Sequence, residues 1–209
     1  NAGTIKYYER GEGKTLLMLP GFGMNMQDWD PELIRQLSLN HRLIILDYPE
    51  VNSQEGLTKS IVQFLDVLKV KQTDILGWSI GSFVAQLLAE QYPERVDKLV
   101  LISTATGGKE MIGASEEIST DIQNNIGGSW EETYVPYLFP EDSIEAKNAY
   151  LARRKDAIKT GELPNEQASS AEARLSLEDI FANQAQEQTR ADKLRLIKAP
   201  TLIIAGDKD

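Results

Sequence analysis

The 209-residue chain is long enough to bury the core of one domain, and it carries a formal net charge of −10. Its hydrophobic content of 41% and charged content of 26% are ordinary for a globular protein. An acidic chain without a basic patch argues against nucleic acid and anionic membrane as partners. The absence of cysteine excludes disulfides and thiol chemistry. With no signal-peptide pattern and no apolar run of spanning length, the composition fits a cytoplasmic protein.

The first half of the chain alternates short apolar runs with helical patterns, which predicts an α/β fold. The expected strands, in chain order, are an edge strand at 4–9 and buried strands at 15–19 and 42–46. The expected helices are a short one opened by Asp30 and Pro31, and a longer one whose apolar face runs from Leu57 to Leu68.

The residues Gly-Trp-Ser-Ile-Gly, at 77–81, lie where a predicted buried strand meets a predicted helix. The strand ends in the apolar Ile75 and Leu76, and the helix keeps one apolar face until Pro93 stops it. On so tight a turn the backbone of the serine is strained, and its neighbours must be nearly free of side chains where strand and helix pack. Two glycines and the small Ser82 meet that need. The pattern predicts a serine hydroxyl at the carboxyl edge of a sheet, beside a helix N-terminus that favours developing negative charge.

The pattern changes after the strand expected at 99–103. From about residue 110 to 194 the sequence shows no strand signal, and helices are expected instead. They are a helix opened by a capping box at Ser129 and disturbed by Pro136, a second at 144–160 closed by Gly161, and a third at 171–188. Residues 201–205 are apolar again and predict a last strand.

Three consecutive stretches carry a resemblance to a known family: the 77–81 motif, the helix ending in Gln91-Tyr92-Pro93-Glu94-Arg95-Val96, and the strand at 99–103. Together they resemble the nucleophile-elbow region of the α/β-hydrolase superfamily, in its branch of serine esterases, lactonases and carbon–carbon-bond hydrolases. The resemblance implies a mostly parallel α/β-hydrolase sheet built from residues 1–106 and 196–209, without the last strand and helix of the family. It also implies a helical cap insertion at 107–195, and no need for a metal ion or an organic cofactor.

The resemblance assigns roles to residues around the motif. Ser79 is the implied nucleophile, and the backbone amides of Phe22 and Ile80 form the implied oxyanion hole. Pro20 stands where the family commonly carries a histidine, a small departure because that histidine packs rather than catalyses. Asp47, after the third strand, is a structural loop residue in this resemblance.

The implied acid of the catalytic triad is Asp209, which closes a Gly-Asp-Lys-Asp sequence, and Asp207 is a less favoured candidate. Aromatic side chains of the cap would line an apolar acyl pocket, although most of them are expected in the core of the cap. The implied substrate contacts are Trp130 and Tyr134 of the cap, together with Trp78 beside the serine.

A serine hydroxyl needs a base, usually histidine, to act as a nucleophile near neutral pH. The one histidine, His41, precedes the strand at 42–46, whereas Ser79 follows its own parallel strand. A strand of five or six residues is about 17–20 Å long, so His41 is expected in a surface loop at the opposite rim of the sheet. In the family, the catalytic histidine follows the acid in the chain. The 209 residues contain no histidine at that position.

The strand at 201–205 would be an apolar edge strand, which proteins normally avoid leaving unprotected. We therefore expect that the 209 residues are a fragment of a longer polypeptide, or that a partner, an exchanged segment or a homo-oligomer covers this edge. Each of these arrangements would give the strand a neighbour.

The residues together favour a serine hydrolase that cleaves a small ester, lactone or related acyl substrate through an acyl-enzyme on Ser79. A serine at the elbow argues against dehalogenase and epoxide-hydrolase chemistry, which similar families perform through an aspartyl ester. The missing histidine favours an alternative, a non-catalytic or truncated ligand-binding or signalling protein on the same fold. A third interpretation is acyl transfer from Ser79 to an acceptor other than water.

Overall fold

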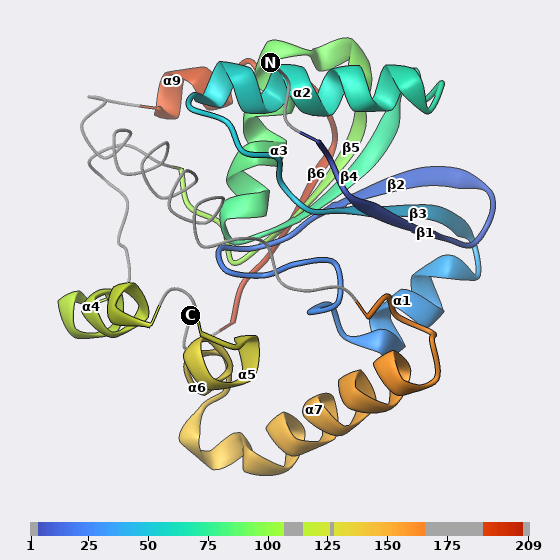
Figure 1. The fold of residues 1–209 in the computed structure, drawn as a ribbon. Coiled ribbons are helices and arrows are strands. Elements are labelled where there is room, and N and C mark those ends of the chain that lie inside the picture. Colours follow the sequence, from blue (N-terminus) through green and yellow to red (C-terminus); the bar gives the residue numbers. More distant parts are fainter. Residues whose placement is uncertain (1–3, 107–114, 126–127, 166–189, 207–209) are drawn as a thin grey trace.

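The computed structural model describes residues 4–106, 115–125, 128–165 and 190–206. These residues form a six-stranded sheet in the order β1-β3-β2-β4-β5-β6, with helices on both of its faces (Figure 1). The edge strand β1 runs antiparallel to β3, and the other neighbouring strands pair in parallel. The mostly parallel α/β sheet predicted from the sequence is confirmed.

The elements follow one another in the order expected for alternating strands and helices. The strands are β1 (Tyr7–Arg10), β2 (Lys14–Leu19), β3 (His41–Leu46), β4 (Thr73–Trp78), β5 (Val96–Ile102) and β6 (Thr201–Ile204). The helices before β5 are α1 (Pro31–Ser38), α2 (Gln54–Val67), α3 (Ile80–Gln91) and the short η1 (Pro93–Arg95). The described residues between β5 and β6, here called the β5–β6 connection, contain α4 (Glu116–Asn124), α5 (Trp130–Thr133), α6 (Val135–Leu138), η2 (Glu141–Ser143), α7 (Ile144–Lys159) and α9 (Ala191–Leu194).

Alternation along the strands divides the apolar core into two clusters, one on each face of the sheet. Leu17 and Ile44 are fully buried in one cluster with α2 and α3. Their neighbours Met18 and Ile45 are fully buried in the other, together with α1 and the aromatic residues of α5 and α7. Because helices close both faces, β2 and β3 are apolar on both sides and appear in the sequence as continuous apolar runs.

The helices predicted beyond β5 are present where the structure describes them. Ser129 accepts a hydrogen bond from the Glu132 N–H and opens α5. Pro136 lies in the first turn of α6, after the break between the two helices at Tyr134. Helix α7 matches the second predicted helix, and Gly161 follows it in the left-handed conformation, with φ 76°. The third predicted helix lies outside the described residues. Helix α4 is not among the predicted elements; it is short, and none of its residues is fully buried.

Strand β6 forms one edge of the described sheet. It pairs with β5, and its apolar residues Leu202, Ile203 and Ile204 are 56%, 63% and 45% exposed. An exposed apolar edge strand is a template for a further strand. It stays a prediction that a further segment of the polypeptide or a partner covers this edge.

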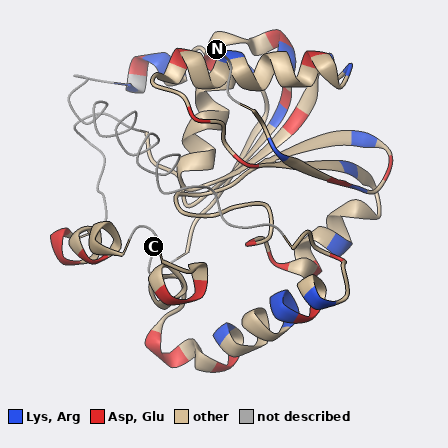
Figure 2. Cartoon of the chain, viewed as in Figure 1, with Lys and Arg blue, Asp and Glu red and all other residues tan. Residues whose placement is uncertain are grey.

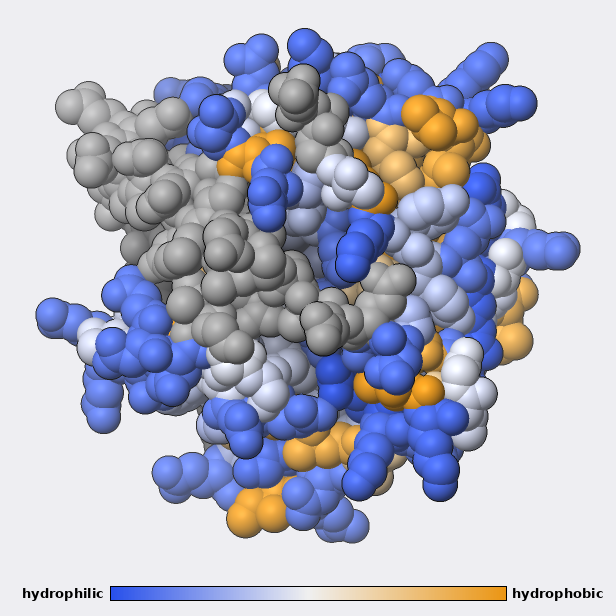
Figure 3. Space-filling model, in the orientation of Figure 1, coloured by the Kyte–Doolittle hydropathy of each residue, from blue (hydrophilic) through white to orange (hydrophobic). Residues whose placement is uncertain are grey.

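Polar residues predominate on the face shown in Figure 3, where apolar side chains form separate small groups. Figure 2 shows acidic residues on α4 and α5 and basic residues gathered on the C-terminal part of α7. Within the ranges that the structure describes, no helix is both long and apolar enough to cross a membrane.

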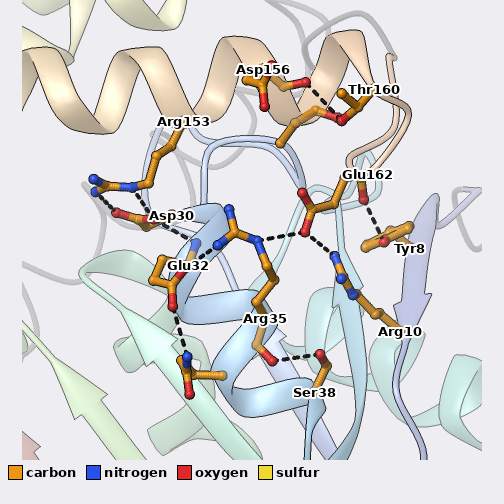
Figure 4. Close-up of polar contacts among 12 residues, drawn as sticks. Tyr8, Arg10, Asp30, Glu32, Arg35, Ser38, Arg153, Asp156, Thr160 and Glu162 are labelled. Carbon is orange, nitrogen blue, oxygen red and sulfur yellow. Dashed lines mark hydrogen bonds and ion pairs between the residues drawn. The ribbon is translucent and has the colours of Figure 1, made fainter.

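The basic end of α7 and the turn after it are attached to the core by ion pairs (Figure 4). Arg153 of α7 donates to the carboxylate of Asp30, the N-cap residue of α1, at 3.1 Å. Glu162, just beyond α7, accepts from Arg10 of β1 at 2.8 Å and from Arg35 of α1 at 2.9 Å. These contacts join the β5–β6 connection to the edge of the sheet formed by the first strands.

The Glu162 ion pairs predict a pH-dependent contribution to stability. The hydrogen bond from Arg10, and then that from Arg35, holds the pKa of Glu162 below its ordinary value of 4.5. A carboxylate with a depressed folded-state pKa stabilises the fold above its unfolded pKa, and this contribution is lost as the pH falls through the folded value. We expect Glu162→Gln to lower the free energy of unfolding by about 0.5–1 kcal/mol at neutral pH, measured by urea denaturation.

The same substitution is expected to cost progressively less in acid. Glu12→Gln, at an exposed position in the turn between β1 and β2, is the matched control and should leave stability unchanged at both pH values. An equal loss for Glu162→Gln at neutral and acid pH would contradict the proposed role of the charge.

Candidate active site

Ser79 lies between the end of β4 and the start of α3, at the carboxyl edge of the sheet. Its φ of 53° and ψ of −119° lie outside the regions that residues with a side chain commonly adopt. The side chain is exposed, and its hydroxyl makes no hydrogen bond with the described part of the protein. The backbone strain expected from the sequence is present, and the hydroxyl is free to react.

The glycines on either side of Ser79 lie where main chain meets main chain. A methyl group placed on Gly77 would lie 2.4 Å from the carbonyl oxygen of Gly81. A methyl group on Gly81 would lie 2.0 Å from the carbonyl oxygen of Leu19, at the end of β2. Both distances are shorter than any real carbon–oxygen contact, so the start of α3 can approach the strand ends only because these two positions lack side chains.

Ser82 stabilises the turn through hydrogen bonds of its buried hydroxyl. Its small size alone did not indicate this role. Its fully buried hydroxyl lies 2.6 Å from the Gly77 carbonyl oxygen and accepts the Ile102 N–H at 3.0 Å. The Ile102 carbonyl in turn accepts the Ser79 N–H at 2.8 Å. One hydroxyl therefore joins α3 to the ends of β4 and β5 directly beside Ser79.

The loop after β2 brings the first predicted oxyanion donor to the same edge. A methyl group on Gly21 would lie 3.5 Å from the Ser79 Cβ, so the residue before Phe22 is in contact with the turn. The N–H of Ile80, the first residue of α3, has no acceptor within its helix. Among the described residues, neither the Phe22 nor the Ile80 N–H donates a hydrogen bond. Two free donors thus flank the serine.

Buried polar groups hold this loop in place. Tyr48 donates to the Pro20 carbonyl at 2.9 Å, and burial raises the pKa of Tyr48 well above its ordinary value, so the hydroxyl stays protonated as a donor. Asp47 accepts the Met26 N–H at 2.7 Å. Asp47 therefore has the structural role expected of it.

A buried ion pair connects the loop after β2 to α7. The Asp28 carboxylate is fully buried; it accepts from the Arg154 Nε at 3.0 Å and from the Asn25 N–H at 2.8 Å. The Asp28 carbonyl accepts from the Tyr150 hydroxyl at 2.8 Å, which in turn accepts the indole N–H of Trp130 at 2.8 Å. The two contacts between Asp28 and α7 join residues more than 100 positions apart, so the sequence offers no local signal for them.

The three predicted substrate contacts form one aromatic cluster beside the turn. The ring centroid of Trp130 lies 6.4 Å from that of Trp78, edge to face, and 5.2 Å from that of Tyr134, stacked. Trp29, which the sequence analysis did not single out, lies 5.9 Å from Trp78 on the other side. Trp130 and Tyr134 are 5% and 4% exposed, whereas Trp78 is half-buried. Packing in the core is thus the established role of Trp130 and Tyr134.

Tyr134 also contacts the loop that carries Phe22. A methyl group on Gly23 would overlap the Tyr134 ring at 2.2 Å, and Gly23 has a positive φ of 75°. The ring centroids of Phe22 and Tyr134 lie 6.2 Å apart, edge to face. The β5–β6 connection therefore packs directly on the loop that flanks Ser79.

His41 lies far from this edge, as expected. It is the first residue of β3, and it pairs with Lys14 at the start of the parallel strand β2. It is half-buried rather than in a surface loop, with its Nδ1 3.2 Å from the Leu37 carbonyl oxygen. The proposed acids, Asp207 and Asp209, lie outside the described residues. Strand β6 runs parallel to β5, so the chain that leads to them leaves the sheet at the carboxyl edge.

The chain matches the model of a known family. The family model for the alpha/beta hydrolase fold matches residues 14–209. Because the match spans nearly the whole chain, the protein belongs to the α/β-hydrolase fold family.

Individual relatives are distant. The pimeloyl-[acyl-carrier protein] methyl ester esterase of Aeromonas salmonicida is 28% identical over 181 residues, which span 80% of this chain and 68% of the relative. A 2-hydroxy-6-oxononadienedioate/2-hydroxy-6-oxononatrienedioate hydrolase of Pseudomonas putida is 25% identical over 225 residues, covering 98% of this chain and 75% of the relative. The crystal structure of the enol-lactonase from Burkholderia xenovorans shares the fold, with a TM-score of 0.73 at 20% identity over 99% of this chain and 79% of that one.

The Ser82 hydrogen bonds predict a large effect of a small substitution. Ser82→Ala removes the acceptor of the Ile102 N–H and the donor to the Gly77 carbonyl at a fully buried position, and we expect it to lower the free energy of unfolding by about 1–3 kcal/mol. Urea denaturation measures this loss. Thr120→Ala, at an exposed position of α4, is the control and should change stability by less than about 0.5 kcal/mol. A Ser82→Ala variant as stable as the wild type would mean that the hydroxyl does not stabilise the turn.

Proposed function

We propose that the protein is a serine hydrolase that cleaves a small ester, lactone or related acyl substrate through an acyl-enzyme on Ser79. The observation that carries the proposal is the strained, exposed serine whose hydroxyl has no partner in the described chain, flanked by two unpaired backbone donors. Strain of this kind persists where function requires it. Family membership, and relatives named as ester-cleaving and other hydrolases, support hydrolysis as the reaction class.

In the first half of the reaction, the Ser79 Oγ attacks the acyl carbon while its proton passes to a base. The carbonyl oxygen becomes an oxyanion and accepts hydrogen bonds from the Phe22 and Ile80 N–H groups. The positive end of the α3 dipole favours the same negative charge. The carbon–oxygen bond to the leaving group then breaks, the base returns the proton to the departing alcohol, and the acyl group remains on Ser79.

In the second half, water replaces the alcohol. The base takes a proton from water, the hydroxide attacks the acyl carbon, and the Ser79 Oγ leaves and regains its proton. The products are a carboxylic acid and free enzyme. This sequence requires no metal ion and no organic cofactor.

The base in this proposal is a histidine oriented by Asp209. His41 cannot serve, because it lies at the amino edge of the sheet. The histidine is therefore supplied from outside these 209 residues. Asp209 suits the role of orienting acid because the chain leaves β6 at the edge where Ser79 lies.

The substrate in this proposal is a small, partly apolar acyl compound. We assign residues 107–195 as a helical cap insertion and residues 1–106 with 196–209 as the α/β-hydrolase core. Trp78, the half-buried member of the aromatic cluster, is the strongest candidate for contact with the acyl group. Trp130 and Tyr134 would shape the pocket from behind it. The net charge of −10 fits a small molecule in the cytoplasm better than a nucleic acid or an anionic membrane.

The alternative is a protein of the same fold that binds a small acyl ligand without turnover. The position of the one histidine, at the opposite edge from Ser79, favours this alternative. It predicts saturable ligand binding that does not change when the Ser79 hydroxyl is removed.

Labelling with a fluorophosphonate distinguishes the two functions. We expect one covalent adduct on Ser79, found by intact mass and peptide mapping, together with hydrolysis of short p-nitrophenyl esters. Ser79→Ala should abolish the adduct and lower kcat/KM by at least about 10³-fold, because no nucleophile remains. Ser143→Ala, in η2, is the control and should retain both activities. Saturable ligand binding without an adduct would favour the non-catalytic alternative.

A further inference from the structure

The proposed donor at Phe22 lies in a part of the loop whose own sequence leaves the backbone free to turn. Phe22 stands between Gly21 and Gly23, and glycine adopts a wide range of backbone conformations. A main-chain N–H points in a direction set by the plane of its peptide bond. The direction of the Phe22 N–H therefore depends on what fixes the peptide planes on either side of Gly21.

Hydrogen bonds from other residues fix both planes. The first plane joins Pro20 to Gly21. Its carbonyl accepts from the Tyr48 hydroxyl at 2.9 Å, and its N–H donates to the sulfur of Met24 at 3.2 Å. The second plane joins Gly21 to Phe22, and its carbonyl accepts from the Met24 N–H at 3.2 Å. Of the four polar groups in these two planes, only the Phe22 N–H makes no hydrogen bond with the described residues.

The Tyr48 hydroxyl binds this loop where the two proposed oxyanion donors approach each other. A methyl group on Gly81 would lie 2.7 Å from the Pro20 carbonyl oxygen, so this oxygen lies against the first turn of α3. Ile80, which carries the second donor, begins the same turn. Tyr48 follows β3 and is buried in the core cluster that contains α2 and α3. One buried side chain therefore holds the loop of Phe22 beside the helix of Ile80.

Packing alone does not require this hydroxyl. The cluster around Tyr48 is apolar, and a phenylalanine would fill the same space. A hydrogen bond that only satisfied the Pro20 carbonyl would contribute to stability. One that also fixed the peptide plane before Phe22 would contribute to catalysis, and the two roles give different kinetic results.

We propose that Tyr48 is a positioning residue for the oxyanion: through the Pro20 carbonyl, its hydroxyl orients the Phe22 N–H toward the oxygen on which negative charge develops. This inference rests on the proposed function and names a further residue of the same site. A donor that is aligned beforehand needs no reorganisation during the reaction, which makes its effect on the oxyanion large. Tyr48 contributes to acylation and deacylation alike, because an oxyanion forms in each.

The test uses the polypeptide as its gene encodes it, with short p-nitrophenyl esters and the matching thionoesters, in which sulfur replaces the carbonyl oxygen. Sulfur is a weak hydrogen-bond acceptor, so an aligned donor favours the oxygen ester. Tyr48→Phe removes only the hydroxyl. We expect its kcat for the oxygen ester to fall about tenfold or more with KM unchanged, because a misplaced donor loses much of its effect. The preference for the oxygen ester over the thionoester should fall by a similar factor.

A matched control makes the same substitution away from the site. The Tyr8 hydroxyl of β1 also donates to a main-chain carbonyl, that of Glu162, at 2.8 Å. Tyr8→Phe should keep both kcat and the preference for the oxygen ester. All rates are expressed per fluorophosphonate-labelled Ser79, so a fraction of unfolded protein does not lower them.

A second variant tests the same peptide plane from its other end. Met24→Leu conserves the volume and removes the sulfur that accepts the Gly21 N–H. Because a thioether is a weak acceptor, we expect kcat and the preference for the oxygen ester to fall by roughly threefold each. If Tyr48→Phe does not fold, this variant decides the question.

Two results would count against the proposal in different ways. An unchanged kcat in the deciding variant, or a loss of kcat that leaves the preference for the oxygen ester at its wild-type value, would overturn the inference alone. The Tyr48 hydroxyl would then only stabilise the loop. A wild-type protein that is not labelled at Ser79 would overturn the proposed function and this inference with it.

Discussion

The start of α3 lies so close to the ends of β2 and β4 that no side chain fits between them, and the candidate site depends on this close packing. Because the chain turns from strand to helix without an intervening loop, Ser79 takes a left-handed backbone conformation with its hydroxyl exposed. The same approach leaves the Ile80 N–H at the open end of the helix, beside the serine. The proposed nucleophile and one of the proposed oxyanion donors are therefore two results of one steric condition, which Gly77 and Gly81 make possible.

The features predicted from the sequence are those with a local cause. The strands β2 and β3 were recognisable because both of their faces are buried, and α7 because its ends are marked by turn residues. The strained serine followed from its two glycine neighbours. Even the distance between His41 and Ser79 was predictable, since residues before and after parallel strands lie at opposite edges.

The features that were missed depend on contacts between distant parts of the chain. Asp28 and Arg154 are separated by 126 positions, and neither stands in a recognisable motif. The buried hydrogen bonds of Ser82 reach β5, and nothing in its own helix indicates them. The strained turn at Ser79 is thus predictable from the sequence, whereas the packing of the β5–β6 connection against the neighbouring loop is visible only in three dimensions.

The buried pair of Asp28 and Arg154 also restricts how this protein can evolve. Replacing Arg154 alone would take this ion-pair partner from the fully buried Asp28 carboxylate, a loss that typically costs about 3–5 kcal/mol, whereas replacing both residues with apolar ones of similar volume can be neutral. Replacing Asp28 alone would leave Arg154 its second ion pair, with Glu131. Among related sequences, the aspartate without the arginine should therefore be rarer than the arginine without the aspartate.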